Sequence, residues 1–330
     1  MKNDTATKKL IIVTGGAGFI GSNVIKLLND RGEFNIIVVD ELGSSEKWKN
    51  LVGKRFIHLL EKDQLFDWLS GRHSEIRAFI HLGACSDTTE MDAAYLLKNN
   101  YQYSKELAEY AIKHGHRFIY ASSAATYGDG SCGFMDDHDQ LQDLQPLNMY
   151  GYSKHLFDLW LKNEGLLDQV VGLKYFNVYG PNECHKGRMA SVVQKFVPIA
   201  QAEGVIKLFK SSEPDKYMDG GQLRDFIYVK DAARMTVDFL DNEASGIYNI
   251  GRGIPTQWNE LANAIFNSLN KPSRIEYFPM PKDLIKAYQN YTCADINKVK
   301  EVLKACANCQ KLEDSVDDYV QNYLIPGKKW

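Results

Sequence analysis

No window of the chain approaches the run of about 18 apolar residues that a membrane-spanning helix needs. The first apolar run, residues 10–13, is followed at once by Thr14-Gly15-Gly16, so it is too short for the core of a signal peptide. Positive charge is not in excess either, since 39 lysines and arginines stand against 42 aspartates and glutamates, a net charge of −3 over 330 residues. We therefore expect a cytoplasmic protein with no membrane partner and no nucleic-acid partner, although a local basic pocket for a phosphate stays compatible with this balance.

Cysteine is sparse and suggests no disulfide framework. The six cysteines are spread over the chain as Cys85, Cys132, Cys184, Cys293, Cys306 and Cys309. Without a sign of export, free thiols are the expected state. The pair Cys306 and Cys309 forms a single C-x-x-C with no second pair at the spacing of a structural zinc site. We expect this pair on a surface helix or loop and predict no metal.

Short apolar runs alternate with amphipathic stretches, which is typical of an α/β protein with a parallel sheet. The predicted buried strands are residues 10–13, 36–39, 79–82, 118–121 and 170–176. The predicted helices are residues 22–29, with Gly32 as the stop, 93–114, ending at Gly115, and 150–163. The last helix carries the apolar stripe Leu156, Phe157, Trp160 and Leu161.

The pattern of short apolar runs and amphipathic stretches changes after about residue 177. Gly180-Pro181 follows the last of these strands, and the polar loops become longer. Residues 211–222 are rich in charge, glycine and serine, which is typical of a mobile loop. Residues 226–229 and 247–250 look like strands that return to the first lobe. We predict a Rossmann-type doubly wound parallel sheet, residues 1–178 and 226–252, with a smaller, discontinuous α/β substrate domain, residues 179–225 and 253–330.

A glycine-rich turn follows the first strand and opens the first helix. Gly15, Gly18 and Gly21 form G-x-x-G-x-x-G, which allows a tight turn, close approach of a pyrophosphate and close helix–strand packing. The helix N-terminus offers free N–H groups to the phosphates. Asp40 closes the second strand at the spacing of a ribose-binding carboxylate. Strand, turn, helix, strand and acid in this order predict a dinucleotide site.

The residues around Asp40 leave the choice between NAD and NADP open. Asp40 and the neighbouring Glu41 favour NAD, because carboxylates repel a 2′-phosphate. Lys47 and Lys62 could neutralise a 2′-phosphate and so favour NADP. The alternative for both lysines is an ordinary solvated surface position.

Tyr150-Gly151-Tyr152-Ser153-Lys154 places Tyr150 and Lys154 one turn apart at the start of a predicted helix. A tyrosine is a weak base at neutral pH, but a nearby ammonium and an oxidised nicotinamide stabilise its phenolate. Lys154 could also hold the nicotinamide ribose. Ser123 lies just past a strand end, where α/β sheets place their ligands, and could hydrogen-bond the reacting oxygen. Together these residues predict a catalytic site.

Long stretches of the chain resemble a known family. They are Gly83-Ala84-Cys85-Ser86-Asp87-Thr88-Thr89-Glu90, residues 99–106, residues 121–128, residues 175–181, His185-Lys186-Gly187 and Met189-Ala190-Ser191. With the turn and the Tyr–Lys pair they resemble the extended short-chain dehydrogenase/reductases, and within them the ADP-L-glycero-D-manno-heptose 6-epimerase family. The resemblance covers nearly the whole chain.

The resemblance implies inversion at C6″ of ADP-D-glycero-β-D-manno-heptose, a step toward the lipopolysaccharide inner core. In this family a bound NADP takes hydride from C6″, the 6″-ketone turns in the site, and hydride returns to the opposite face. Two acid–base groups are needed, and the family pattern assigns them to Tyr150 and Lys186, with Ser123 orienting the oxygen. A lysine beside the nicotinamide and another lysine could have a lowered pKa. Homo-oligomers, often pentamers, are also implied.

By the same resemblance, further residues hold the ligands. The implied cofactor residues are Phe19, Ile20, Asp40, Glu41, Lys47, Lys62, Leu82, Gly83, Ala84, Cys85, Ser86, Asn99, Lys154, Val178 and Lys186. The implied substrate residues are Ser123, Asn177, Arg188, Lys195, Phe209, Lys210, Ser211, Ser212, Arg224 and Tyr288. Arg224 suits the substrate pyrophosphate because its fork binds phosphate oxygens. Lys154, Lys186, Arg188 and Arg224 are expected to cluster around the anionic ligands.

The chain departs from the family pattern at several positions. Glu41 stands where asparagine is expected, which bears on the choice between NADP and NAD. Leu82 replaces an acidic or polar residue, and Arg188 and Lys195 replace serine and histidine. The segment 213–222 is longer than usual. These departures bear on the contacts to the substrate and leave the chemistry intact.

Two other functions compete with this interpretation. Another nucleotide-sugar enzyme, such as a 4-epimerase or a 4,6-dehydratase, would share the cofactor site. A dehydratase needs acidic residues where this chain has Ser123-Ala124-Ala125, and the stretch around Lys186 favours the two-base reaction over a 4-epimerase. A non-catalytic dinucleotide sensor would keep the glycine turn but has no use for Tyr150 and Lys154.

Overall fold

The computed structural model describes residues 9–285 and 288–330, and its centre is a sheet of seven parallel strands. In spatial order the strands are β11 (Gly246–Ile250), β6 (Val171–Tyr175), β5 (Arg117–Ser123), β4 (Ile76–His81), β1 (Leu10–Thr14), β2 (Ile36–Val39) and β3 (His58–Leu60). The order reverses between β1 and β4, which creates the crevice where such sheets bind ligands. The predicted Rossmann-type doubly wound fold is confirmed.

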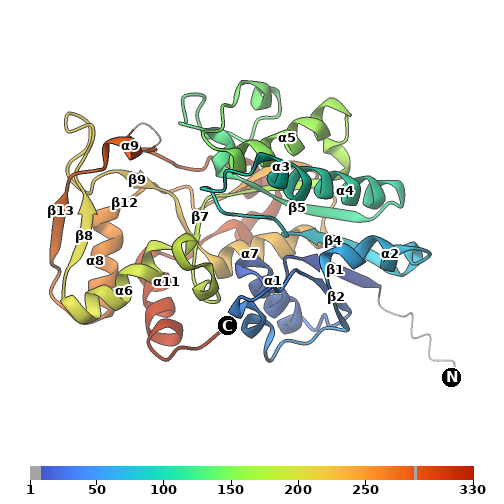
Figure 1. Ribbon diagram of the computed structural model, residues 1–330, viewed down its shortest axis with the longest axis horizontal. Helices are drawn as coiled ribbons and strands as arrows, with labels where there is room; N and C mark the ends of the chain where they lie inside the picture. Colours follow the sequence, from blue (N-terminus) through green and yellow to red (C-terminus); the bar gives the residue numbers. More distant parts are fainter. Residues whose placement is uncertain (1–8, 286–287) are drawn as a thin grey trace.

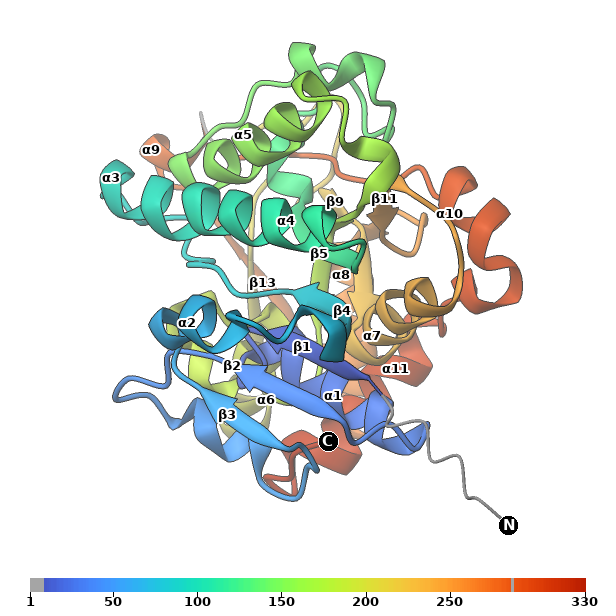
Figure 2. The same cartoon turned by 90° about the vertical axis from the view of Figure 1, so that its right-hand side faces the viewer.

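Helices cover both faces of this sheet, as the two views in Figures 1 and 2 show. One face packs against α1 (Phe19–Asp30) and α7 (Val229–Asp238), and the other against α2 (Leu65–Leu69), α4 (Tyr103–Lys113) and α5 (Met149–Asn163). The strands supply alternate residues to the two cores: Ile11 and Val13 of β1 face α1, whereas Ile12 faces α4. The β-branched runs of the sequence therefore form strands that are buried on both sides.

A second lobe lies beside the sheet, at the left of Figure 1. Its helices are α6 (Val192–Glu203), α8 (Trp258–Ser268) and α11 (Leu312–Tyr319), and they share one apolar core with the parallel pair β8 (Ile206–Phe209) and β13 (Ile275–Phe278). The shorter elements are β9 (Leu223–Arg224), which pairs antiparallel with β12 (Thr256–Gln257), and the helices α3 (Ala93–Leu96), α9 (Lys282–Ile285) and α10 (Asn297–Leu303). Val299 and Leu303 of α10 pack in the core of the first lobe. The exact domain boundaries stay a prediction.

Two predicted elements have features that the sequence did not indicate. The predicted strand at residues 226–229 is present as β10 (Phe226–Tyr228), which pairs in parallel with β7 (Asn177–Tyr179) in a two-stranded sheet separate from the large one. An apolar run signals a strand but does not name its partner. The predicted helix over residues 93–114 is present, but it is not α-helical along its whole length. A π-helix, Leu97–Gln102, lies between α3 and α4. The segment 211–222 contains no helix or strand, as predicted, although Gln222 at its end is buried.

Among the residues described here, no helix is long and apolar enough to cross a bilayer. All six cysteines are free thiols. Cys306 is exposed and Cys309 is half-buried.

Candidate active site

One large cavity of about 620 Å³ opens at the carboxyl ends of the central strands. Its wall includes Thr14 at the end of β1, Ser123 at the end of β5 and Tyr175 at the end of β6. Every residue that the sequence assigned to the cofactor lines this cavity: Gly15, Gly18, Phe19, Ile20, Gly21, Asp40, Glu41, Lys47, Lys62, Leu82, Gly83, Ala84, Cys85, Ser86, Asn99, Lys154, Val178 and Lys186. The predicted catalytic residues Ser123 and Tyr150 line it as well. Residues that are as far apart in the sequence as Gly15 and Lys186 therefore line the same cavity.

The glycine turn has room for a ligand and none for side chains. Gly15 has a φ of +65°, and a Cβ there would lie 2.7 Å from the backbone nitrogen of Gly83 on the neighbouring strand end. A Cβ on Gly21 would lie 2.2 Å from the carbonyl oxygen of Gly15. Helix α1 begins at Phe19, directly after Gly18, so its free N–H groups face the cavity. The turn fits a pyrophosphate placed at a helix N-terminus.

The carboxylates after β2 are each paired with a lysine. Asp40 accepts a hydrogen bond from the backbone N–H of Ala17 at 2.8 Å, and its other oxygen lies 2.6 Å from Lys47 Nζ. Glu41 lies 2.5 Å from Lys62 Nζ, and the hydrogen bond from Lys62 lowers the pKa of Glu41. The two lysines are therefore not simply solvated surface residues, as one interpretation of the sequence had it.

Tyr150 and Lys154 lie on the first turns of α5, and the side chain of Asn148 caps this helix by accepting the N–H of Gly151 at 2.8 Å. Burial raises the pKa of Tyr150, and a hydrogen bond with Ser123 opposes the rise. Lys154 donates to the carbonyl oxygen of Ala121 at 3.0 Å. Burial lowers the pKa of Lys154 to about 8. Tyr150 therefore needs nearby positive charge before it can act as a base.

Asn100 in the π-helix fixes the wall of the cavity, a role that the sequence did not single out. Its side chain accepts from the N–H of Cys85 at 2.9 Å and donates to the carbonyl oxygen of Cys85 at 3.0 Å. It also donates to Ser153 Oγ on α5 at 3.1 Å. The loop after β4 is thereby tied to the helix that carries Tyr150. The preceding residue, Asn99, accepts from Lys62 at 3.0 Å.

Lys186 reaches the cavity from a short 3-10 helix, Cys184–Met189, and its Nζ lies 5.3 Å from the ring centre of Phe19. The buried carboxylate of Glu183 anchors this segment by accepting from the N–H of Gly180 at 3.1 Å and from the N–H of Ser191 at 2.5 Å. Burial is the main cause that lowers the pKa of Lys186, and Lys195 adds to it. The sequence had attributed a lowered pKa to neighbouring positive charge alone.

The predicted substrate residues other than Ser123 lie outside this cavity and form two groups. Arg188, 70% exposed, pairs with Asp87 at 2.6 Å, and Lys195 donates to the carbonyl oxygen of Arg188 at 2.7 Å. In the second lobe, buried Arg224 lies over the ring of Tyr288 at 4.8 Å. The others are Asn177, whose strand pairs with β10, and Phe209, Lys210, Ser211 and Ser212, at and after the end of β8. The expected four-cation cluster is thus split: of its four members, Lys154 and Lys186 line the cavity, whereas Arg188 and Arg224 do not.

Arg224 and its aromatic neighbours could grip an anion in the second lobe. Trp258, which the sequence did not single out, places its ring 5.8 Å from the Arg224 guanidinium. Phe209 lies edge-on to Tyr288, with 6.2 Å between ring centres. Such rings hold the guanidinium without neutralising it, so its charge stays available.

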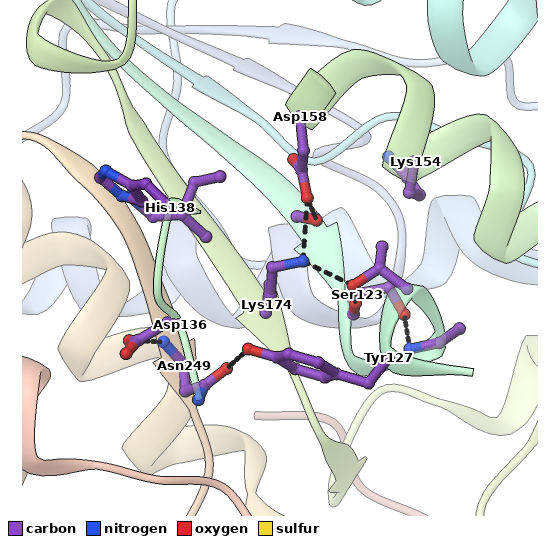
Figure 3. Close-up of polar contacts among 12 residues, drawn as sticks. Ser123, Tyr127, Asp136, His138, Lys154, Asp158, Lys174 and Asn249 are labelled. Carbon is purple, nitrogen blue, oxygen red and sulfur yellow. Dashed lines mark hydrogen bonds and ion pairs between the residues drawn. The ribbon is translucent and has the colours of Figure 1, made fainter. Parts of the chain in front are cut away.

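Below the catalytic face, α5 buries charge as well as the predicted apolar stripe. Phe157 and Leu161 are buried as predicted, whereas Leu156 and Trp160 are only partly so. Asp158 is fully buried and pairs with Lys174 of β6 at 3.1 Å, as Figure 3 shows. The sequence did not single out either residue.

Known proteins resemble this chain over nearly its whole length. A profile of the NAD dependent epimerase/dehydratase family matches residues 11–251. A protein of Nitratidesulfovibrio vulgaris named ADP-L-glycero-D-manno-heptose-6-epimerase is 48% identical over 322 residues, which cover 96% of this chain and 98% of the relative.

Solved structures share the fold. The crystal structure of Helicobacter pylori ADP-L-glycero-D-manno-heptose-6-epimerase superposes with a TM-score of 0.79 at 29% identity, covering 96% of each chain. The UDP-glucose 4-epimerase of Thermotoga maritima, solved with UDP-glucose, superposes with a TM-score of 0.77 at 26% identity. That match covers 97% of this chain and 100% of the other.

Proposed function

The chain belongs to the NAD dependent epimerase/dehydratase family, and from this premise we propose that it is an isomerase that inverts C6″ of ADP-D-glycero-β-D-manno-heptose. The product, ADP-L-glycero-β-D-manno-heptose, is a precursor for the lipopolysaccharide core. The predicted resemblance to heptose 6-epimerases agrees with the name of the relative at 48% identity. The observation that carries the proposal is the presence of Tyr150 and Lys186, from distant parts of the chain, on the wall of one cavity.

The reaction requires proton transfer at the 6″-oxygen on both faces of the sugar. A nicotinamide dinucleotide held by the residues that line the cavity would supply the hydride chemistry at C6″. Tyr150 removes the proton from the hydroxyl of one epimer, and its hydrogen bond with Ser123 places the phenol for this step. Lys186 serves the other epimer, and its lowered pKa makes a neutral amine accessible. Lys154 stabilises the Tyr150 phenolate.

The substrate is proposed to span the cavity and the second lobe. Arg224 takes the pyrophosphate, and the rings of Phe209 and Tyr288 pack nearby. Outside the cavity, Arg188 pairs with Asp87 of the cavity wall, and Lys195 donates to the carbonyl oxygen of Arg188. Asn177, Lys210, Ser211 and Ser212 complete the proposed contacts. Ser123 holds the reacting oxygen.

The position of inversion distinguishes this proposal from its alternative. The purified protein, incubated with ADP-D-glycero-β-D-manno-heptose, is expected to yield the L-glycero epimer, observed by NMR at the C6″ proton. The likeness to a UDP-glucose 4-epimerase makes inversion at C4 of a UDP-sugar the second candidate. Conversion of UDP-glucose with no change at C6″ of the heptose would replace the first assignment with the second.

We propose NADP as the bound cofactor, with NAD as the alternative. Lys47 and Lys62 supply the two positive charges that a 2′-phosphate requires. Each of them is paired with a carboxylate in the structure, and Glu41 is the more exposed of the two acids. Glu41 therefore competes with the phosphate for Lys62, whereas Asp40 is also occupied by the N–H of Ala17.

Removing the charge of Glu41 is expected to strengthen NADP binding relative to NAD. In Glu41→Gln, Lys62 keeps a neutral neighbour and its charge is free for the phosphate, so the ratio of the two dissociation constants should shift about tenfold toward NADP. Isothermal titration of both nucleotides measures this ratio. Glu46→Gln, which removes an exposed acid paired with Lys49, is the control. Tighter binding of NAD than of NADP by the unaltered protein would make NAD the cofactor.

We also propose an oligomeric state, a compartment and a domain division for this enzyme. The resemblance implies a homo-oligomer, often a pentamer, and sedimentation of the purified protein measures that state directly. Six free thiols are compatible with a reducing compartment, and we propose that the protein acts in the cytoplasm. The division into a cofactor domain, residues 1–178 and 226–252, and a substrate domain, residues 179–225 and 253–330, is proposed to follow the two ligands.

A further inference from the structure

A buried ion pair lies beneath the catalytic residues. Asp158 of α5 and Lys174 of β6 are both 0% exposed, and the carboxylate lies 3.1 Å from Nζ. Asp158 is one helical turn after Lys154, so the two side chains share a face of α5. Figure 3 shows the pair beside the strand end that carries Ser123.

The Asp158 carboxylate joins α5 to the strand that ends at Ser123. Tyr120 donates its hydroxyl to one carboxylate oxygen at 2.9 Å, and Ser122 donates to the other at 2.7 Å. Both donors lie on β5, whose last residue is Ser123. The helix that carries Tyr150 and Lys154 is thus held against the strand that carries Ser123.

Lys174 extends the same connection to the turn after β5. The strand register places Lys174 beside Ser122. Its ammonium donates to Thr126 Oγ1 at 2.5 Å, and Thr126 in turn donates to the carbonyl oxygen of Ser123 at 2.8 Å. The ring of Tyr127 lies 4.8 Å from Lys174 Nζ. Every polar contact of the pair therefore leads to β5, to α5 or to the turn that follows Ser123.

The electrostatic effect of Asp158 reaches Lys154. The groups that face the carboxylate from the surrounding elements are Lys154 and His155 on α5, Tyr120 and Ser122 on β5, Tyr127 after β5, His138 in the preceding loop and Lys174 on β6. Burial lowers the pKa of Lys154, and the negative charge of Asp158 is the largest opposing cause. Burial likewise lowers the pKa of Lys174, and Asp158 opposes this too.

Stability alone gives little reason for such a pair, because a buried ion pair can often be replaced by apolar residues without loss. Resting on the function proposed above, we propose that Asp158, held in place by Lys174, is a positioning residue for the reaction: it fixes α5 against the strand that ends at Ser123 and places a negative charge behind Lys154, which lines the cavity. Asp158 itself does not line the cavity. It acts through Lys154 and through the hydroxyls of Tyr120 and Ser122.

The pH dependence of the reaction tests this role. Lys154 must be charged to stabilise the Tyr150 phenolate, so its deprotonation sets the alkaline limb of kcat. Loss of the Asp158 charge lowers the pKa of Lys154 further, and the alkaline limb should move down by about one pH unit in Asp158→Asn. A structural role alone would lower stability and leave the limb in place.

The double variant Asp158→Asn/Lys174→Gln keeps hydrogen-bonding groups at both positions and leaves neither member of the pair as an unpaired charge. It is therefore the variant that decides the question where Asp158→Asn fails to fold. The matched control is Asp318→Asn/Lys230→Gln. It removes an ion pair that joins α11 to α7, with 2.7 Å between Lys230 Nζ and the Asp318 carboxylate, which also accepts a hydrogen bond from Tyr228. The control should keep the alkaline limb of the unaltered enzyme.

A second readout does not depend on activity. NMR titration of protein labelled with ¹³C at lysine Cε, with the Lys154 signal assigned from Lys154→Arg, should show its midpoint about one pH unit lower in Asp158→Asn and lower by a smaller step in the double variant, where the loss of the Lys174 charge partly compensates. An unchanged midpoint in the folded double variant would overturn the positioning role, whether or not the protein inverts C6″. A protein that fails to invert C6″ but shows the shifted midpoint would contradict the proposed function and leave this role standing.

Discussion

Tyr150→Phe lowers kcat for inversion at C6″ about a thousandfold, the expected result of removing one of two acid–base groups. The substitution removes a single hydroxyl, whose hydrogen-bond partner in the site is Ser123, and leaves the ring in its half-buried position. Cofactor binding should stay within about twofold of the unaltered enzyme, because the glycine turn and Lys154 are untouched. Product formation by NMR and nucleotide titration measure the two quantities.

The control for Tyr150→Phe lies on the same helix. Tyr152→Phe removes the hydroxyl of a tyrosine that is 44% exposed and outside the cavity wall, so it should retain full activity. A Tyr150→Phe enzyme that inverts C6″ at the unaltered rate would exclude Tyr150 as a base.

Lys186→Met is expected to cause a loss of similar size, about a thousandfold in kcat. Methionine keeps most of the length and the apolar character of the stem but removes the ammonium near the Phe19 ring, so it cannot accept or donate a proton. Since Lys186 lies on a different segment from Tyr150, the two groups can approach the sugar from different directions. Lys113→Met, at an exposed position at the end of α4, is the control and should behave like the unaltered enzyme.

The two variants together test whether there are two bases. Each should still oxidise one epimer of the substrate, seen as absorbance of the reduced nicotinamide, without completing the inversion. The two variants should fail with opposite epimers, because each retains the base that serves one of them. Loss of oxidation of both epimers in Tyr150→Phe, with Lys186→Met fully active, would show that a single base serves both faces.

The cofactor turn could be predicted from the sequence because its determinants are local. Gly15, Gly18 and Gly21 must be glycine for reasons that act within a few residues: a positive φ at Gly15 and close backbone approach at Gly21. The strand before them and the helix after them are equally local patterns. Tyr150 and Lys154 were found for the same reason, since their spacing fixes their shared face.

The ion pair of Asp158 and Lys174 could not be predicted in this way. A charged residue on an amphipathic helix is usually solvated, and nothing near Asp158 in the sequence marks a partner. The pairing depends on which strands lie next to β5, and strand order is a property of the whole fold. The partner of β10 could not be predicted for the same reason: its apolar run is local, whereas its pairing with β7 is not.

The π-helix at Leu97–Gln102 has a consequence for how this part of the chain can vary in length. A π-turn contains about one residue more than an α-turn. The rotation of α3 relative to α4 about the helix axis therefore depends on that extra residue. Within it Asn99 contacts Lys62, and Asn100 contacts Cys85 and Ser153. Deleting one residue here would give an uninterrupted helix and turn one end of it by roughly 100° relative to the other. A one-residue deletion that would be harmless in a surface loop would therefore separate Asn99 and Asn100 from their hydrogen-bond partners.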